Sequence, residues 1–307
     1  MEILRLVGRH EGLFSPRPEP QLRRQNRVRT IQGSLAIEGN TLSTAQITAI
    51  LDGRRVAGPR RDIVEVQNAI AVYAEAALLA PALRRDLLRA HRGMMRKLIP
   101  DAGRFRTGGV GVWHGSRVAH VAPPAARVPE LVEQVLAFVG RDREVHALVK
   151  SAVAHYEIEF IHPFSDGNGR MGRLWQHVML LRVHPLFEFV PVESVVRARQ
   201  DEYYAALQTC DRAGSSTAFI DFSLRAILEA LQDLTRSLTV SPRTIRDRLE
   251  IAREHFGARE FSRKEYRALQ KTISSATASR DLRDAVAVKT LRRRGDKATA
   301  RYRFAGR

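Results

Sequence analysis

A stretch of twelve residues near the middle of the chain constrains the fold more than any other feature. It runs from His162 to Arg173 and reads His-Pro-Phe-Ser-Asp-Gly-Asn-Gly-Arg-Met-Gly-Arg. Helical patterning precedes it over residues 145–160 and follows it over residues 170–183, so the stretch is predicted to be a glycine-rich turn between two helices. A turn that enters a helix presents unpaired backbone N–H groups and the positive end of the helix dipole. The sequence therefore predicts an anion site here.

Glycines and arginines in this stretch suit the binding of phosphate. Gly167 and Gly169 let the backbone bend tightly and approach a ligand without a Cβ in the way. Arg170 and Arg173 are three residues apart, so they lie on one face of the following helix and can both reach phosphate oxygens. The alternative is a surface turn with solvated arginines, but the complete order of residue types favours the phosphate site.

Two other residues of the stretch supply reactive groups. Asp166 offers a hard oxygen ligand of the kind that Mg²⁺ shares with phosphates. His162, at the end of the preceding helix, can take a proton from an attacking hydroxyl near neutral pH. These residue types together predict a site that handles a nucleotide phosphate.

The same stretch resembles the complete signature of the Fic family, His-Pro-Phe-x-(Asp/Glu)-Gly-Asn-Gly-Arg-x-x-Arg. The resemblance implies a mostly helical fold and the transfer of AMP from ATP to a hydroxyl of a target protein. It implies that His162 is the general base, that Phe164 anchors the loop in the core, and that Asp166 holds Mg²⁺ or Mn²⁺. Gly167 favours AMP transfer, because this position is altered in the related Doc toxins, where ATP binds reversed. The residues implied to bind ATP are Gly167, Asn168, Gly169, Arg170 and Arg173.

Residues 103–124 predict a β-hairpin, because valines alternate there with small or polar residues before Pro123 and Pro124 end the pattern. The segment resembles the family's flap, which is expected to pair its edge with an extended segment of the target protein. A hairpin with a purely structural role is the alternative. The residues expected to dock the target are Val110, Gly111 and Val112.

A second informative stretch runs from Ser34 to Asn40. Ser34 and Glu38 are four residues apart on one face of a predicted helix over residues 21–37. The stretch resembles the family's inhibitory motif, (Ser/Thr)-x-x-x-Glu-(Gly/Asn), in the subclass that carries it N-terminal to the catalytic core. An ordinary helix end with a solvated carboxylate is the alternative.

The inhibition implied by this resemblance is a competition for one guanidinium. A bidentate, charge-assisted pair between Glu38 and Arg173 would withdraw the arginine from the γ-phosphate of ATP. The same carboxylate could instead orient a water for the reverse reaction, the removal of AMP, and the sequence leaves the two open.

The C-terminal part of the chain is strongly basic. Residues 241–307 hold 19 Lys and Arg against 8 Asp and Glu, a net charge of +11 out of the +18 of the whole chain. Its pattern of helix, turn, helix and a strand pair around Gly295 resembles a winged helix-turn-helix. Thr277, Ser279 and Arg280 would then face outward on a recognition helix, with Arg292, Arg293 and Arg294 in the wing.

DNA is one expected ligand of this module, and a protein partner is the alternative. A rival interpretation of the whole chain is a DNA-binding transcription regulator whose central region only senses nucleotide.

The expected architecture is mainly α, with a Fic-fold helical core, a β-hairpin flap and a small C-terminal winged-helix domain. Residues 1–60 would hold an N-terminal arm, extended over its first twenty residues, and the inhibitory helix. Residues 61–238 would form the catalytic domain and residues 239–307 the winged helix-turn-helix. A single helix is expected over residues 195–210. Its part from Arg197 to Cys210, with Tyr203 and Tyr204, resembles a family segment on the nucleotide side, and a structural role for the two tyrosines is equally open.

Expected surroundings and partners follow from the rest of the sequence. Cys210 is the single cysteine, no run of about 18 apolar residues exists, and the first residues lack the apolar core of a signal peptide. We therefore expect a cytoplasmic protein that does not enter a membrane. Its expected partners are ATP and a target protein with a Tyr, Ser or Thr acceptor, and a homodimer stays open.

Overall fold

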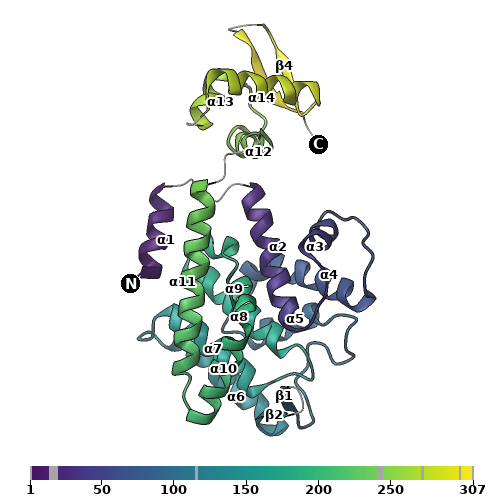
Figure 1. Cartoon of the computed structure of the whole chain (residues 1–307), viewed down its shortest axis with the longest axis vertical. Helices are drawn as coiled ribbons and strands as arrows, with labels where there is room; N and C mark the ends of the chain where they lie inside the picture. The colour runs from purple at the N-terminus through teal and green to yellow at the C-terminus, as the bar shows by residue number, and fades with distance from the viewer. Residues whose placement is uncertain are drawn as a thin grey trace. The chain divides into compact units, whose positions relative to one another are not determined.

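The computed structural model describes residues 2–13, 20–114, 117–240, 245–270, 273–296 and 299–305. Figure 1 traces the chain through these residues. The chain divides into two compact units, one formed by Met1–Pro16 with Gln25–Arg236 and the other by Arg17–Arg24 with Ser237–Arg307. Each unit is described by itself. Among the described helices, none combines the length and the apolar composition that a membrane span requires.

The first helix, α1 (Glu2–Leu13), corrects the expectation of an extended arm over the first twenty residues. Ile3, Leu6 and Val7 are buried, and their spacing of three and four residues is that of one helix face. Glu2 pairs with Arg5 across the first turn at 2.5 Å. Pro16, Pro18 and Pro20, which favour an extended chain, all follow this helix in the sequence and do not interrupt it.

The next helices precede the central motif along the chain. They are α2 (Pro20–Ile37), α3 (Thr44–Leu51), α4 (Arg60–Glu75) and α5 (Arg84–Met94), with a 3₁₀ turn η1 (Ala76–Leu78) after α4. Helix α3 begins with a capping box, in which the Ser43 hydroxyl accepts from Gln46 N and the Gln46 side chain accepts from Ser43 N. Pro81 lies in the turn before α5.

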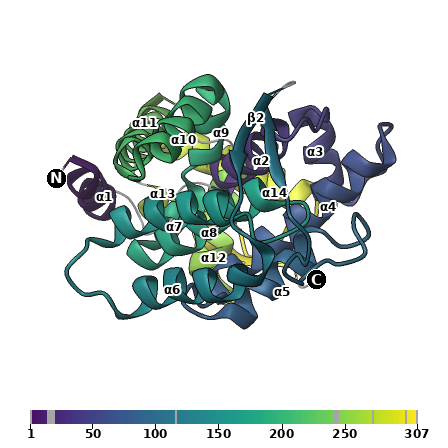
Figure 2. The same cartoon turned by 90° about the horizontal axis from the view of Figure 1, so that it is seen from below.

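The centre of the first unit is the antiparallel helix pair on either side of the motif. After α6 (Val128–Arg141), α7 (Ala147–Ile161) leads into the motif and α8 (Asn168–Val183) leaves it. Every residue of α8 from 168 to 180 except Gly169 is buried. A helix buried all round has no polar face, so its position at the core could not be found from amphipathic periodicity. Figures 1 and 2 show α8 enclosed by its neighbours.

The remaining helices of this unit are η3 (Pro185–Phe189), α9 (Val192–Ala198), α10 (Gln200–Ala213) and α11 (Thr217–Val240). The single helix expected over residues 195–210 is therefore wrong, since the chain breaks at Arg199. Arg199 is held at the break by ion pairs to Glu202 at 3.2 Å and Glu229 at 2.7 Å. Neither glycine nor proline marks this position.

The predicted hairpin is confirmed and its strands are short. Strands β1 (Gly111–His114) and β2 (Arg117–Val121) pair antiparallel, with Gly111 opposite Val121 and a register shift after Val112. A 3₁₀ turn, η2 (Ala125–Arg127), then leads into α6.

The second unit has its own core and a small sheet. It contains α12 (Ile245–Phe256), β3 (Phe261–Ser262), α13 (Arg263–Gln270), α14 (Ser275–Ala287), β4 (Leu291–Arg294) and β5 (Arg301–Phe304). The strands are antiparallel in the order β3-β5-β4. Buried Phe261, Tyr266, Leu282 and Phe304 pack between the helices and the sheet.

Candidate functional site

The turn between α7 and α8 is fixed by its own backbone and by Phe164. His162 ends α7 in the left-handed conformation, with φ 48° and ψ 61°, while its N–H still donates to Ile158 O at 3.1 Å. The Phe164 ring is fully buried, which matches its expected role as the anchor. Asn168 closes the turn, because its side chain accepts from Phe164 N and donates to Phe164 O, both at 2.9 Å. The Asn168 amide is therefore occupied within the loop.

Two buried residues outside the motif, His91 and Arg106, support this turn. The His91 ring stacks on Phe164 with 3.6 Å between centroids. Its Nδ1 accepts from Gly103 N at 2.8 Å, so its Nε2 carries the proton and donates to Asp166 O at 3.0 Å. Burial lowers the pKa of His91 from its ordinary value, in keeping with a neutral ring.

Arg106, the second of these residues, ties the hairpin to the motif. Its guanidinium donates to His162 O at 2.7 Å, to Gly108 O at 2.8 Å and to Pro123 O at 2.5 Å. Its backbone N–H donates to Pro163 O at 3.0 Å. Gly108 and Pro123 stand at the two ends of the hairpin, so one buried cation fixes both ends against the carbonyl of His162. Of the expected docking residues, Val110 is half-buried just before β1, whereas Gly111 and Val112 lie within the strand.

The start of α8 is shaped for an anion. Its first helical bond runs from Met171 N to Gly167 O at 2.9 Å, which leaves the N–H groups of residues 168–170 for an external acceptor. Gly167 has φ +87°, and a Cβ there would lie 2.6 Å from Met95 Sδ. Position 167 therefore requires glycine both for its backbone conformation and for its contact.

Arg173 and Glu38 form an ion pair at this site. Arg173 Nη2 donates to Glu38 Oε1 at 2.6 Å and to Ser34 O at 3.0 Å, and its Nε donates to Ser34 Oγ at 3.2 Å. The Arg173 side chain is 2% exposed and that of Glu38 is 27% exposed. Burial on its own would lower the pKa of Arg173, but Glu38, Tyr203 and Glu159 together raise it. The structure thus joins the two residues that the sequence predicts to pair, but the contact runs through one guanidinium nitrogen and is not the expected bidentate one.

The helix that presents Glu38 is seated closely on α9. A Cβ on Gly33 would lie 2.7 Å from the carbonyl group of Glu193 and from Ser194 N. Ile31 and Leu35, on either side of Gly33 in α2, are buried in the main core. Gln200, at the start of α10, donates to Ile37 O at 3.3 Å and so caps the end of α2.

Arg170 is buried between two carboxylates. It donates to Glu65 Oε1 at 3.0 Å and to Asp166 Oδ1 at 2.9 Å. Glu65 also accepts from the Asn40 side chain at 2.9 Å, which links the end of the Ser34–Asn40 stretch to the motif. Arg170 Nε is buried without a hydrogen-bond partner. The charge of Arg170 is therefore largely matched within the protein.

Asp166 is the accessible carboxylate of the motif. Its side chain is 36% exposed, and it accepts from Gly167 N at 2.6 Å and from Arg61 at 3.1 Å. Among the described residues, no group of three His, Cys, Asp or Glu side chains is placed to hold a metal ion. One exposed carboxylate beside a phosphate site suits Mg²⁺, which commonly takes one or two protein carboxylates together with substrate phosphates and waters. The residues present fit that ion.

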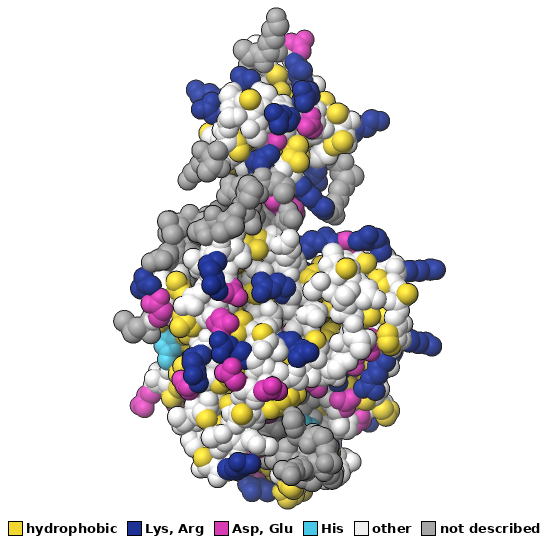
Figure 3. Space-filling view, in the orientation of Figure 1, with side chains coloured by type: hydrophobic (Ala, Val, Ile, Leu, Met, Phe, Trp, Pro, Cys, Tyr) yellow, Lys and Arg dark blue, Asp and Glu magenta, His cyan; other side chains and the backbone are white. Residues whose placement is uncertain are grey.

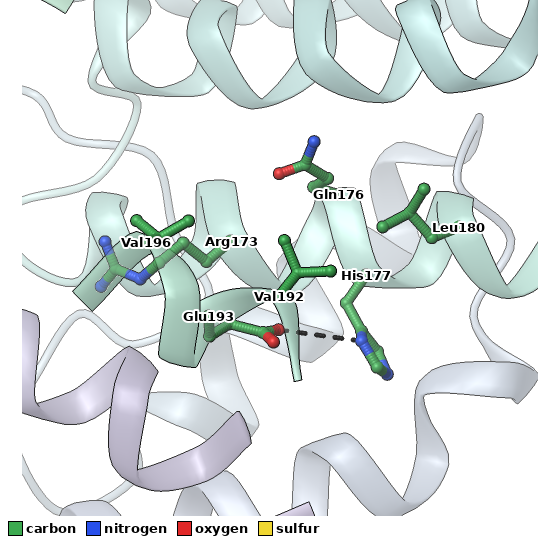
Figure 4. A pocket seen from close by; sticks show the side chains of 7 residues that line it. All are labelled: Arg173, Gln176, His177, Leu180, Val192, Glu193 and Val196. Atoms are coloured by element: carbon green, nitrogen blue, oxygen red, sulfur yellow. Dashed lines mark ion pairs between the residues drawn. The ribbon is translucent and has the colours of Figure 1, made fainter. Parts of the chain in front are cut away.

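Arg173 also borders a small pocket, which Figure 4 shows with the side chains of Glu193, His177, Gln176 and Val192 around it. Glu193 accepts from Tyr73 OH at 3.2 Å, while its Oε2 is buried without a partner. Burial raises the pKa of Glu193 to about 7 and lowers the pKa of His177 to about 4.

In the second unit, the residues expected on the recognition helix lie on α14. Arg280 is exposed, whereas Thr277 and Ser279 are half-buried, and Ser279 Oγ accepts from Arg263 at 3.0 Å. Arg292, Arg293 and Arg294 are exposed on β4.

The region that contains the central motif also matches a known protein family. The Fic/DOC family matches residues 81–180 of the chain. Protein adenylyltransferase Fic of Nematostella vectensis is 31% identical over 226 residues, which cover 69% of this chain and 49% of that protein. The chain thus spans about half the length of this curated relative.

Solved structures extend the similarity to the whole chain. A Fic family protein from Desulfovibrio desulfuricans G20 is 39% identical, with a TM-score of 0.73, over 100% of this chain and 94% of that one. Fic-1 from Caenorhabditis elegans is 25% identical, with a TM-score of 0.62, over 78% of this chain and 73% of that one.

Proposed function

The chain belongs to the Fic family, and on that premise we propose that it is an autoinhibited protein adenylyltransferase. It would transfer AMP from ATP to a Tyr, Ser or Thr hydroxyl of a target protein. The observation that carries this proposal is the contact of Glu38 with Arg173 at the mouth of an otherwise complete anion site. The adenylyltransferase name of the curated relative supports the same activity.

The roles of the motif residues follow from their positions. The free N–H groups at the start of α8 would bind the phosphates at Gly167, Asn168 and Gly169, with the Asn168 amide reserved for the loop. Arg173 would hold the γ-phosphate once Glu38 leaves it. Arg170, already paired with Glu65 and Asp166, would contribute its charge at the base of the site.

The proposed reaction is an in-line displacement at the α-phosphorus. The acceptor hydroxyl oxygen forms a bond to that phosphorus while the bond to the bridging α,β oxygen breaks, and pyrophosphate leaves. His162 takes the hydroxyl proton as the bond forms. Mg²⁺ held by Asp166 would supply charge neutralisation for the phosphates. Arg106 positions the hairpin, and with it an extended target segment, next to the His162 carbonyl.

Autoinhibition would work through charge. Glu38 and the γ-phosphate are both anions that need the same buried guanidinium, and hydrogen bonds between ionised groups are about twice as strong as neutral ones. With Glu38 in place, ATP binds with its α-phosphate out of line with the acceptor. The enzyme is then inactive although nucleotide is present.

Replacement of Glu38 tests the proposal. Glu38→Gly is expected to raise the incorporation of label from [α-³²P]ATP into protein, and His162→Ala in the same background is expected to abolish it. Glu144→Gly, at an exposed turn between α6 and α7, is the matched control and should leave incorporation unchanged. If Glu38→Gly showed the same incorporation as the unaltered protein, inhibition by Glu38 would be ruled out. If no variant incorporated label with any target tested, the transfer itself would be in doubt.

Removal of AMP is the second candidate reaction at the same site. Glu38 is partly exposed beside Arg173, so its free oxygen can orient a water toward a bound AMP-modified side chain. A target modified beforehand would lose its label in the presence of the unaltered protein and keep it with Glu38→Gly.

For the second unit, we propose a winged helix-turn-helix that contacts duplex DNA. On the hairpin of β4 and β5, Arg292 stands opposite Arg303 and Arg294 opposite Arg301, and all four are exposed. Like charges directly opposite on a strand pair are destabilising, so their presence here favours a polyanionic ligand. Lys and Arg side chains gather over this unit on the face that Figure 3 shows.

An electrophoretic shift assay tests DNA binding. The full chain is expected to shift duplex fragments, and replacement of Arg292 and Arg303 by alanine should weaken the shift and reduce its salt dependence by about two charges. Arg225→Ala with Arg236→Ala, two exposed arginines of α11, is the matched control. Transfer that depends on His162, in a protein that shifts no DNA, would favour the enzyme alone over a regulator with a sensing core.

A further inference from the structure

A second carboxylate stands at the phosphate site beside Glu38. A Cβ built on Gly169 would lie 2.4 Å from Glu38 Oε1 and 3.3 Å from Glu159 Oε1, and 3.1 Å from Arg173 Nη1. The two carboxylates and the guanidinium therefore meet over one glycine, at the place where the free N–H groups of α8 face an anion site. The Glu159 side chain is only 14% exposed. It takes no part in the reaction proposed for this site.

Glu159 is the end of a buried chain of hydrogen bonds. Tyr203 OH is 2.8 Å from Glu159 Oε1 and 3.2 Å from His155 Nε2. His155 Nδ1 is 2.9 Å from Gln176 Oε1, and Gln176 Nε2 donates to Ser223 Oγ at 2.6 Å. Tyr203 and His155 are each 1% exposed, so these groups have no access to bulk water.

This chain of hydrogen bonds can satisfy its members with Glu159 either protonated or ionised. When Glu159 is protonated, it donates to the Tyr203 oxygen, Tyr203 donates to His155 Nε2, and His155 Nδ1 donates to Gln176 Oε1. When Glu159 is ionised, Tyr203 donates to the carboxylate and His155 Nε2 donates to Tyr203, with the Gln176 amide turned over to donate to Nδ1. Glu159 can thus gain or lose a proton without leaving a buried polar atom unpaired.

The charges that face Glu159 come from three other helices. They are Arg173 on α8, Glu38 at the end of α2, and Tyr203 and Asp211 on α10, while His155 lies one turn earlier on α7 itself. Burial raises the pKa of Glu159 to about 7, with Arg173 opposing that rise and Glu38 adding to it. A triphosphate at Arg173 carries more negative charge than Glu38, so its arrival favours the protonated carboxyl further.

We infer that Glu159 is a positioning residue of the phosphate site, which takes up a proton from solvent when nucleotide phosphates arrive at Arg173. As an ionised group, Glu159 shares the charge of Arg173 and repels phosphate. As a neutral group, it leaves Arg173 to the nucleotide and still anchors the site through Tyr203. This inference rests on the proposed function, because it assumes that nucleotide binds here.

Calorimetry of nucleotide binding measures the proton directly. The full-length Glu38→Gly variant is titrated at pH 8 with Mg²⁺ and an ATP analogue that has a methylene bridge between its α- and β-phosphates. The titration is repeated in buffers of different ionisation enthalpy, and the slope of the observed enthalpy against that quantity gives the protons taken up. We expect net uptake that approaches about one proton per nucleotide, and affinity that falls by up to about tenfold for each pH unit above 7.

Matched variants assign the proton. Glu159→Gln in the same background should bind the analogue with no comparable uptake and with a flat pH profile, since its side chain keeps the shape and the hydrogen bond to Tyr203. Glu157→Gln, two residues away on α7, should behave like the parent. Tyr203→Phe should move the uptake to higher pH, because the hydrogen bond of Tyr203 lowers the pKa of Glu159.

The outcomes separate this inference from the proposed function. Binding with no proton uptake in the parent, or with the same uptake in Glu159→Gln, would overturn the role of Glu159 and leave the adenylyltransferase intact. Absence of nucleotide binding in every variant would overturn both.

Discussion

Gly167 and Met95 are in contact so close that no side chain fits between them. A Cβ on Gly167 would lie 2.6 Å from Met95 Sδ, and Met95 is fully buried. Gly167→Ala must therefore displace the Met95 side chain or the loop, and it also strains a backbone at φ +87°. A displacement of about 1 Å can cost on the order of 100-fold in rate, so we expect label transfer to fall by about that factor.

Substitution of a second glycine distinguishes the effect of the Met95 contact at Gly167 from the effect of backbone strain there. Gly214 has φ +60°, and a Cβ added there would meet no atom within 4 Å, so Gly214→Ala carries the backbone cost alone. We expect it to lose about 1 kcal/mol of stability in urea unfolding and to keep full transfer. Full transfer by Gly167→Ala would contradict the importance of the contact.

Arg106 is expected to be irreplaceable by lysine. Its guanidinium donates to carbonyls of three separate segments, at His162, Gly108 and Pro123, which a single ammonium group cannot reach together. Arg106→Lys should lower the free energy of unfolding in urea by about 2–4 kcal/mol, because buried carbonyls lose their donors. Arg104→Lys, at an exposed position two residues earlier, should be neutral, and equal effects of the two changes would exclude this explanation.

Asp166 is expected to set the metal requirement of transfer. Asp166→Asn keeps an acceptor for Gly167 N but removes the charge that suits Mg²⁺. The Mg²⁺ concentration for half-maximal label transfer in the Glu38→Gly background should rise by on the order of tenfold or more. Asp142→Asn, in the turn between α6 and α7, is the control. An unchanged Mg²⁺ requirement in Asp166→Asn would remove Asp166 from the metal site.

Glu193 is expected to make the stability of the folded protein fall as the pH rises. Burial raises its pKa in the folded protein to about 7, above the ordinary value of 4.5. Its contribution to stability is therefore present below pH 4.5 and is lost as the pH rises through 7. Relative to the unaltered protein, Glu193→Gln should gain about 2 kcal/mol of unfolding free energy between pH 5 and pH 8. Urea unfolding at the two pH values measures the difference, and Glu188→Gln, which is exposed, should show none.

The parts of the fold that the sequence predicts are those with a local signal. The Ser43 capping box marks the start of α3, and the valine alternation locates the hairpin. At the N-terminus two local signals conflict, because the spacing of Ile3, Leu6 and Val7 favours a helix whereas the prolines that follow favour an extended arm. The break at Arg199 has no local signal, because ion pairs to residues on α10 and α11 hold it.

The residues of the candidate site also divide into those with a local signal in the sequence and those without one. His162, Asp166 and Arg173 belong to one continuous motif, so the sequence identifies them together. His91, Arg106 and Glu159 each act through contacts to segments far away along the chain, and a single residue of an ordinary type carries no such information. Of these three, Arg106 had the clearest hint in the sequence, since it lies immediately before the glycine-rich hairpin.

The close seat of Gly33 on the backbone of Glu193 bears on how inhibition is relieved. Because that contact and buried Ile31 and Leu35 hold α2 in place, detaching the helix would expose part of the core, whereas turning the Glu38 side chain exposes nothing. Rotation of a partly exposed side chain takes picoseconds to nanoseconds, while helix movements take microseconds or longer. We therefore expect inhibition to be relieved by rotation of the Glu38 side chain alone, with no delay for a movement of α2.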